Sequence, residues 1–224
     1  MIRQPSFVMQ NTNQENINKD GQAIGRKGAE SRARLLEATR KLLAELPSAR
    51  KLTASSIARA AGLASQTFYL YFDDVEEILL SLSAAASEDT ADIIAALNAP
   101  WDLAAPRDYT TLVVEAFYQY WDRHRAILNI RNYMSDRGDE PFAKVRNESA
   151  MPIITKIAAR MRLAQGEDRL TERDSLARAI IIFSAIERMA ARYSATSGQA
   201  FMPGGDELKR AEADILALLI SPPR

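Results

Sequence analysis

The chain of 224 residues contains no cysteine, a single histidine and no long apolar run. The lack of cysteine excludes disulfides, thiol nucleophiles and cysteine-based metal sites, and it fits the cytoplasmic location that we expect. No segment approaches the roughly 18 continuous apolar residues of a membrane-spanning helix, so we expect no membrane partner. The sequence also lacks an alternating strand pattern, an internal repeat and a glycine-rich phosphate loop. We therefore predict an all-α fold.

Few residues suited to catalysis remain. Without cysteine and with one histidine, His124, no spacing of a nucleophile with a base, or of metal ligands, is recognisable. Four acids at 73, 74, 76 and 77 precede or open a helical pattern, where carboxylates stabilise the positive helix end, and this explanation is preferred to a metal site. We predict no enzymatic activity, no metal and no cofactor, and we expect His124 at a helix junction.

The net charge of zero conceals an uneven distribution. Residues 26–72 contain nine Lys or Arg and three acids, a balance of +6, whereas residues 1–25 balance at zero and residues 73–224 therefore carry −6. A polyanionic partner such as DNA explains this asymmetry. A basic surface that is merely solvated would have the same composition.

Residues 1–28 are predicted to form a disordered N-terminal arm. They are rich in Asn, Gln, Asp and Lys, with almost no apolar periodicity and no apolar segment of the kind found in secretory signals. Near the end of the arm, Arg26 and Lys27 either contact a phosphate backbone or minor groove, or belong to an idle basic tail.

The pattern that organises the chain lies at residues 53–72. Thr53 is a suitable N-cap, and Ile57 and Ala58 begin a small apolar face at helical spacing. Gly62 then ends the helix in the left-handed conformation that glycine adopts without steric cost. A small residue at Ala58 and glycine four positions later suit two closely crossing helices, as in a helix-turn-helix, although an ordinary helical hairpin has a similar pattern.

The second helix of this pair is predicted over residues 65–72. Phe68 and Phe72 are four residues apart and point inward, whereas polar groups point outward. The outward residues are Ser65, Gln66, Thr67, Tyr69 and Tyr71. In a helix-turn-helix, the N-terminal residues of this second helix contact base edges, and Gln66 can pair with adenine.

The remaining apolar patterns are also helical. Residues 30–46 form an amphipathic helix that ends at Pro47, and a helix capped by Asp74 runs to about residue 98. We predict further helices at residues 107–134 with an interruption at 122–124, at 142–163 with a bend or restart at Pro152, at 171–194, and at 207–219 after a cap at Asp206. In all we predict about nine helices. The helix at 171–194 is apolar on two sides, and one of these suggests a partner subunit.

These features resemble the tetracycline-repressor (TetR) family of bacterial transcription regulators. The match is specific over residues 30–82, and its motif is Thr53-x-x-x-Ile57-Ala58-x-x-Ala61-Gly62-Leu63-x-x-x-Thr67-Phe68-Tyr69-x-Tyr71-Phe72, then Glu76-Glu77-Ile78-Leu79. The resemblance implies a helix-turn-helix DNA-binding head at residues 29–74 and a larger helical domain for ligand binding and dimerisation at 75–224. It also implies a homodimer joined by the last two helices. A small effector would spread the two heads and release a palindromic double-stranded DNA operator.

The resemblance also assigns roles to individual residues. Thr53, Tyr69 and Tyr71 would hold phosphates, and Ser65, Gln66 and Thr67 would face base edges. Many family members have a lysine just after the cap of the fourth helix, but this chain has Val75 there. Lys51 or Arg50 could compensate for that lost phosphate contact.

Aromatic, methionine and polar residues of the second domain are candidates for the effector site. They are Trp101, Phe117, Tyr118, Trp121, Asn129, Tyr133, Met151, Phe183 and Glu187. Aromatic and methionine residues at this spacing also make an ordinary core, so a cavity is one of two interpretations. If a cavity exists, its ligand is largely apolar. Glu187 stands in an apolar stretch and needs either a ligand or a structural partner.

The leading hypothesis from the sequence is a ligand-responsive DNA-binding regulator, in particular a repressor. The alternative is a helical ligand carrier or interaction protein whose helix-turn-helix is vestigial. Val75 favours this alternative, and the charge of +6 on residues 26–72 argues against it.

Overall fold

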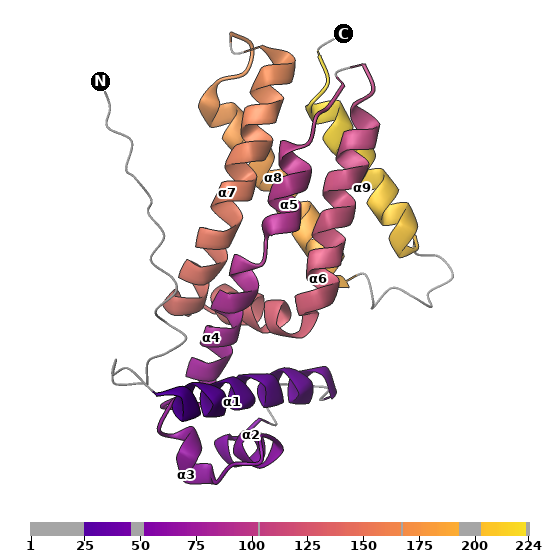
Figure 1. Ribbon diagram of the computed structural model, residues 1–224. Coiled ribbons are helices and arrows are strands. Elements are labelled where there is room, and N and C mark those ends of the chain that lie inside the picture. The colour runs from indigo at the N-terminus through magenta and orange to yellow at the C-terminus, as the bar shows by residue number, and fades with distance from the viewer. Residues whose placement is uncertain (1–24, 46–51, 103, 167, 193–202, 223–224) are drawn as a thin grey trace, which may run out of the picture. The chain divides into compact units, whose positions relative to one another are not determined.

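The structure, a computed structural model, describes residues 25–45, 52–102, 104–166, 168–192 and 203–222 (Figure 1). These residues form nine α-helices and no strand, which confirms the predicted all-α fold. Contacts within the chain divide it into two compact units, Met1–Leu82 and Ser83–Arg224. The helices in the described residues are too short or too polar to cross a lipid bilayer.

The first unit contains α1 (Arg26–Glu45), α2 (Ala54–Ala60), α3 (Ser65–Phe68) and the start of α4 (Val75–Glu88). Because α1 begins at Arg26, residues 26–28 form a helical turn rather than the end of the disordered arm that we expected. The predicted apolar face is buried at Leu35, Ala38 and Leu43. Residues 1–24, Leu46 and Pro47 lie outside the described residues.

The turn between α2 and α3 has the predicted geometry. Thr53 caps α2, since its hydroxyl accepts a hydrogen bond from the Ser56 N–H at 3.1 Å, and the Ser56 hydroxyl accepts one from the Thr53 N–H at 3.0 Å. Gly62 has a φ of 65°. From α1, the Arg34 guanidinium donates to the carbonyl oxygens of Ala61 and Gly62. This contact places positive charge at the C-terminal end of α2, where unpaired carbonyls carry partial negative charge.

The second helix of the motif is shorter than predicted. α3 ends at Phe68, and the chain continues in turns closed by hydrogen bonds from the Leu70 N–H to the Thr67 oxygen and from the Tyr71 N–H to the Phe68 oxygen. Phe68 and Phe72 are fully buried, as predicted, with their ring centroids 5.7 Å apart. Burial of the two rings therefore holds this segment, because a four-residue helix has little stability of its own.

The fourth helix ends earlier than predicted. Asp74 caps it, as expected, by accepting a hydrogen bond from the Glu77 N–H at 2.9 Å. However, α4 stops at Glu88, and α5 (Ala91–Asn98) is a separate helix. At the break, Asp89 lies 2.7 Å from His124 Nε2. His124 itself lies inside the continuous helix of residues 106–136, so our prediction that it stands at a helix junction is wrong. The apolar pattern continues on both sides of the break, and the sequence therefore did not reveal it.

The second unit is built around α6 (Pro106–Asp136), which packs against α5, α7 (Glu140–Gln165), α8 (Glu172–Arg192) and α9 (Gly205–Leu219) (Figure 1). The predicted interruption at residues 122–124 is wrong, because α6 is continuous over 31 residues. Polar side chains there pair at the surface of the helix instead of breaking it. Arg123 lies 3.1 Å from Asp92, and Asp122 pairs with Arg125.

Two further helix boundaries differ from the predictions. At Pro152, where we predicted a bend or a restart, α7 does not restart, because Pro152 is exposed and lies inside a continuous helix. Solvent can satisfy a carbonyl oxygen that loses its partner at an exposed proline. Asp206 is the second residue of α9 rather than its cap, because the Gly204 N–H donates to Glu207 at 2.7 Å and Gly204 takes the N-cap position.

We expect Gly62→Ala to destabilise the first unit by about 1–2 kcal/mol. An alanine would have to keep a φ of 65°, and its Cβ would lie 2.8 Å from Arg34 Nη2. Urea unfolding followed by circular dichroism measures the change. Gly25→Ala is the control, because nothing lies within 4 Å of its Cβ position. Equal stability of the two variants would contradict the role given to the left-handed turn.

Candidate functional site

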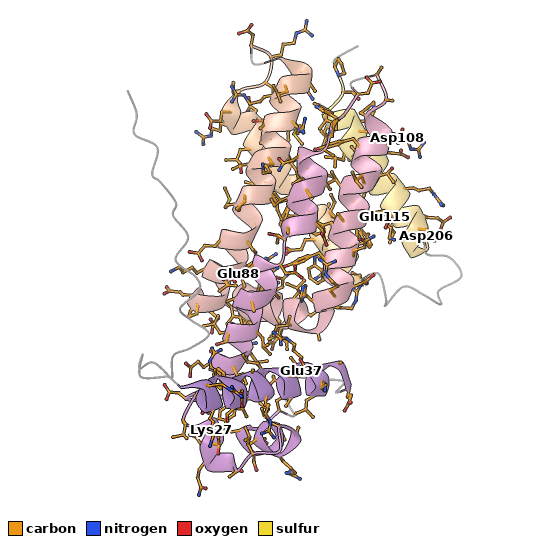
Figure 2. The ribbon with its side chains drawn as sticks, viewed as in Figure 1. Lys27, Glu37, Glu88, Asp108, Glu115 and Asp206 are labelled. Carbon is orange, nitrogen blue, oxygen red and sulfur yellow. The ribbon has the colours of Figure 1, made fainter. Side chains whose placement is uncertain are left out.

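The outer surface of the helix-turn-helix carries the residues predicted to bind DNA. Of the six that lie between residues 53 and 71, Thr53, Ser65, Gln66 and Tyr69 are exposed and Thr67 and Tyr71 are half-buried. Arg26 and Lys27 are exposed in the first turn of α1, where Figure 2 labels Lys27. Lys51 lies outside the described residues. One compact unit thus brings most of the predicted set together.

Several of these side chains also have structural contacts. The Ser65 and Ser55 hydroxyl oxygens lie 3.2 Å apart and join α3 to α2. The Tyr69 ring packs edge-on against Phe68 with centroids 5.4 Å apart, yet 52% of Tyr69 is exposed. Tyr69 therefore shields the core with one side of its ring and leaves polar surface outside. A tyrosine hydroxyl in this position can hydrogen-bond to a phosphate.

Part of the positive charge of the first unit acts within the unit. The Arg32 guanidinium lies over the Phe72 ring at 5.2 Å, and Arg40 and Lys41 lie 3.6 Å and 3.7 Å from Glu37.

At the start of α4, Glu77 accepts a hydrogen bond from the Asp73 N–H. Asp74 and Glu77 therefore cap the N-terminal end of α4. Among the described residues, no group of His, Asp or Glu is arranged to hold a metal ion.

The second unit contains a small cavity of about 10 Å³. Four predicted ligand residues line it: Phe117, Trp121, Phe183 and Glu187. The other lining residues, which we did not predict, are Thr90, Tyr120, Arg131, Ser149 and Ile153. A space of this size holds about one water molecule. A larger ligand must therefore separate side chains of α6, α7 and α8.

The other predicted ligand residues lie elsewhere. Trp101 packs against the Tyr109 ring and lies 5.2 Å from the Arg160 guanidinium. Tyr118 is buried and lies 5.3 Å from Lys209 of α9. The remaining three, Asn129, Tyr133 and Met151, are exposed. Spacing along a helix did not show which neighbouring helix each side chain meets.

A buried ionic cluster borders the cavity. Glu187 Oε1 accepts a hydrogen bond from Arg131 at 3.1 Å, and Glu187 Oε2 accepts one from Arg146 at 2.6 Å. Arg131 and Glu187 are only 3% and 4% exposed. Arg146 also lies 2.8 Å from Asp136, whose side chain is 64% exposed. Of the two partners that we considered for Glu187, a ligand or a structural partner, the structure shows a structural one, a pair of arginines.

Arg131 contacts three helices besides its own. From α6 it donates to Glu187 of α8, to the Ser87 hydroxyl of α4 at 3.1 Å and to the Ser149 hydroxyl of α7 at 3.2 Å. Burial lowers the pKa of Arg131 from its ordinary value. Its position could have been found in the sequence, because it follows the buried Ile127 and Leu128 at helical spacing.

A second buried carboxyl lies between α6 and α9. Burial raises the pKa of Glu212 to about 7, and a hydrogen bond with Tyr118 opposes part of this rise. Nearby on α9, Lys209 lies 3.2 Å from Glu115 and 3.9 Å from Asp206, both labelled in Figure 2. The α6–α9 contact thus contains a set of paired charges around Lys209 and one acid, Glu212, whose pKa is raised to about 7.

The fold and the exposed helix-turn-helix define a DNA-binding transcription regulator. Residues 35–82 match the family described as bacterial regulatory proteins of the tetR family, and residues 94–216 match the tetracyclin repressor-like C-terminal domain. The chain belongs to this TetR family of transcription regulators, whose members bind DNA operators and small effectors and are not enzymes. No curated protein sequence matches it significantly.

Solved structures of other regulators share the fold. The fatty acid degradation regulator FadR from Bacillus halodurans is 17% identical, with a TM-score of 0.58 over 89% of this chain and 96% of that one. A TetR/AcrR regulator from Thermobifida fusca YX-ER1 is 14% identical, with a TM-score of 0.55 over 83% and 96%. The Thermus thermophilus FadR in complex with lauroyl-CoA is 19% identical, with a TM-score of 0.52 over 84% and 92%.

We expect Glu187→Ala to destabilise the protein by about 3–5 kcal/mol, because the change leaves Arg131 without its buried counter-ion. Asp136→Ala is the matched control. It removes the exposed partner of Arg146 and should cost about 1 kcal/mol or less. Chemical denaturation at neutral pH measures both. A cost for Glu187→Ala as small as that of the control would contradict the structural role of the cluster.

The raised pKa of Glu212 predicts a dependence of stability on pH. Between pH 4.5 and about 7 the unfolded chain ionises this carboxyl while the folded protein resists ionisation, so stability falls as pH rises through that window. Glu212→Gln removes this loss. Its stability relative to wild type should be about 3 kcal/mol greater at pH 8 than at pH 4.5.

Thermal and urea unfolding at the two pH values measure the effect of Glu212→Gln. Glu115→Gln is the control, because it changes a half-exposed acid on the same α6–α9 contact. A pH-independent difference between Glu212→Gln and wild type would show that Glu212 ionises normally.

Proposed function

We propose that the protein is a ligand-responsive repressor that binds a palindromic operator as a homodimer. The observation that carries this proposal is the exposed polar surface of α3 and the following turn, held in place by the buried Phe68 and Phe72. A recognition element needs this combination of a fixed backbone and exposed side chains. The charge of +6 on residues 26–72 supports attraction to DNA.

In this proposal the residues of the first unit divide the work of DNA binding. Thr53, Tyr69 and Tyr71 contact phosphates and fix the position of the unit on the duplex. Base edges are contacted by Ser65, Gln66 and Thr67, with Gln66 suited to adenine. The basic residues Arg26, Lys27 and Lys51 add contacts to the backbone. Val75 is half-buried and apolar, so it supplies no phosphate contact.

Dimerisation through the last two helices is supported by their exposed apolar residues. On α8, Ile180 and Ile181 are 42% and 71% exposed, and on α9, Ile215 and Leu218 are 50% and 72% exposed. Large apolar side chains that gather on a surface mark a site of protein association. A two-fold dimer would place two recognition elements on half-sites that are related by the same symmetry.

The effector site in this proposal is the cavity between α6, α7 and α8. Phe117, Trp121, Ile153 and Phe183 make most of its lining apolar. An effector with an apolar body fits such walls and enters as these side chains separate. Lauroyl-CoA is bound by the FadR of Thermus thermophilus. At 19% identity that likeness shows the fold and does not identify the effector of this chain.

A titration with DNA tests the proposal. Full-length protein is added to labelled duplexes from the intergenic region beside its own gene and to shuffled duplexes, at low and moderate salt. We expect selective binding that weakens steeply with salt. Tyr69→Phe should weaken binding to every sequence by a similar factor, about three- to tenfold. Gln66→Ala should instead change preference at one operator position by about 1–3 kcal/mol.

Tyr133→Phe is the matched control for Tyr69→Phe, because Tyr133 is about equally exposed, at 48%, but belongs to the second unit. Equal effects of the Tyr69 and Gln66 variants on every sequence would contradict the division of labour. If the protein bound no DNA in a salt-dependent manner, the repressor proposal would fail and the ligand-carrier alternative would replace it.

A further inference from the structure

The polar lining of the cavity in the second unit is unbalanced between donors and acceptors. Trp121 and Arg131 present N–H groups, whereas Glu187 is the only ionised acceptor. Both oxygens of Glu187 already accept hydrogen bonds from guanidinium groups. A ligand head group that enters this space therefore meets two groups that can only donate, together with the hydroxyls of Thr90, Tyr120 and Ser149, which can donate or accept.

Trp121 is the first of these donors. Its side chain is completely buried, and none of the described residues accepts a hydrogen bond from its indole N–H. A buried donor without an acceptor costs roughly 1–3 kcal/mol. The same ring lines the cavity together with Phe117 and Phe183. An acceptor placed in the cavity can recover that cost.

Arg131 is the second donor, and it shares its counter-ion. Glu187 divides its two oxygens between Arg131 and Arg146. The other partners of Arg131 carry no charge: Asn132 Oδ1, the hydroxyls of Ser87 and Ser149, and Tyr120, so a new anion would displace one of these neutral groups. Because two guanidinium groups share the single negative charge of Glu187, a second anion beside Arg131 would be electrostatically favourable. Arg146 can retain Glu187 through its second oxygen while Arg131 receives the new group.

We propose that this cavity recognises an organic acid: a carboxylate that accepts hydrogen bonds from Arg131 and Trp121, attached to an apolar body that packs against Phe117, Ile153 and Phe183. This inference rests on the proposed effector function of the second unit and specifies the chemistry of the effector. A cationic head group would face the Arg131 charge. A neutral amide could accept from Trp121 but would bring no charge to Arg131.

The experiment uses full-length protein carrying Trp101→Phe, so that Trp121 is the only tryptophan and its fluorescence reports on the cavity. The probes are three compounds with one type of apolar body: 4-phenylbutyrate, 4-phenylbutanamide and 4-phenylbutylamine. Octanoate, octanamide and octylamine form a second series. We expect saturable quenching by a carboxylate, with an affinity about tenfold or more above that of its amide, and still weaker binding of the amine.

Two variants assign this preference to its donors. Arg131→Gln should remove the preference for carboxylate over amide, and Glu187 keeps Arg146 as its partner in that variant. Trp121→Phe is made in the protein that retains Trp101, and its binding is measured by calorimetry because the fluorescent reporter is lost. This variant keeps an aromatic ring and should weaken carboxylate binding by about five- to tenfold. Arg160→Gln is the matched control, since Arg160 is a half-buried arginine of α7 that lies over Trp101 and Tyr109 instead.

Circular dichroism and gel filtration establish that each variant is folded. If Arg131→Gln fails to fold, calorimetry on Trp121→Phe decides the question. The proposal is overturned if neither carboxylate binds saturably, if amides or amines bind as well as carboxylates, or if the preference persists in folded Arg131→Gln. Measurements of DNA release distinguish a failure of the proposed carboxylate site from a failure of the proposed effector function. A neutral compound that releases DNA would leave only the effector function standing, and carboxylate binding without any change in DNA affinity would leave only the site.

Discussion

The larger unit depends on the burial of one carboxylate between two guanidiniums. Glu187 of α8 holds Arg131 of α6 and Arg146 of α7, and Arg131 also reaches Ser87 at the end of α4. A buried ion pair contributes little net stability compared with well-packed apolar residues. Removing one member is costly, however, so the cluster specifies how these helices must meet. It also lies beside the cavity, where a ligand could redistribute its hydrogen bonds.

The first unit is specified by different physics. Its packing is apolar, around Phe68 and Phe72, and polar interactions cap the two ends of α2: Thr53 does so locally at the start, and Arg34 of α1 does so at the Ala61–Gly62 carbonyls. Such an arrangement fixes the backbone of a very short recognition helix and leaves Gln66 and Tyr69 exposed. A DNA-binding surface needs a fixed backbone more than a stable isolated helix, because its side chains must meet base edges in register.

Local structure was predicted correctly wherever a residue type favours one particular geometry. The cap at Thr53, the left-handed Gly62 and the buried Phe68 and Phe72 follow directly from the sequence. Predictions failed where a local signal had to be weighed against packing. The polar residues 122–124 did not interrupt α6, and the continuous apolar pattern after Val75 hid the end of α4 at Glu88. Only contacts with other helices decide these cases.

The sequence by itself determined the fold class and the helix-turn-helix, and it selected the exposed residues that we propose to bind DNA, because these depend on spacing within short segments. The tertiary structure alone decided which residues converge on the cavity. Phe117, Trp121, Phe183 and Glu187 line the cavity together with Arg131, which we did not predict. Trp101 and Tyr118 instead contact Tyr109 and Lys209. The periodicity of a helix shows which side chains are buried. It does not show which helix they face, because that depends on crossing angles set by the packing of the whole unit.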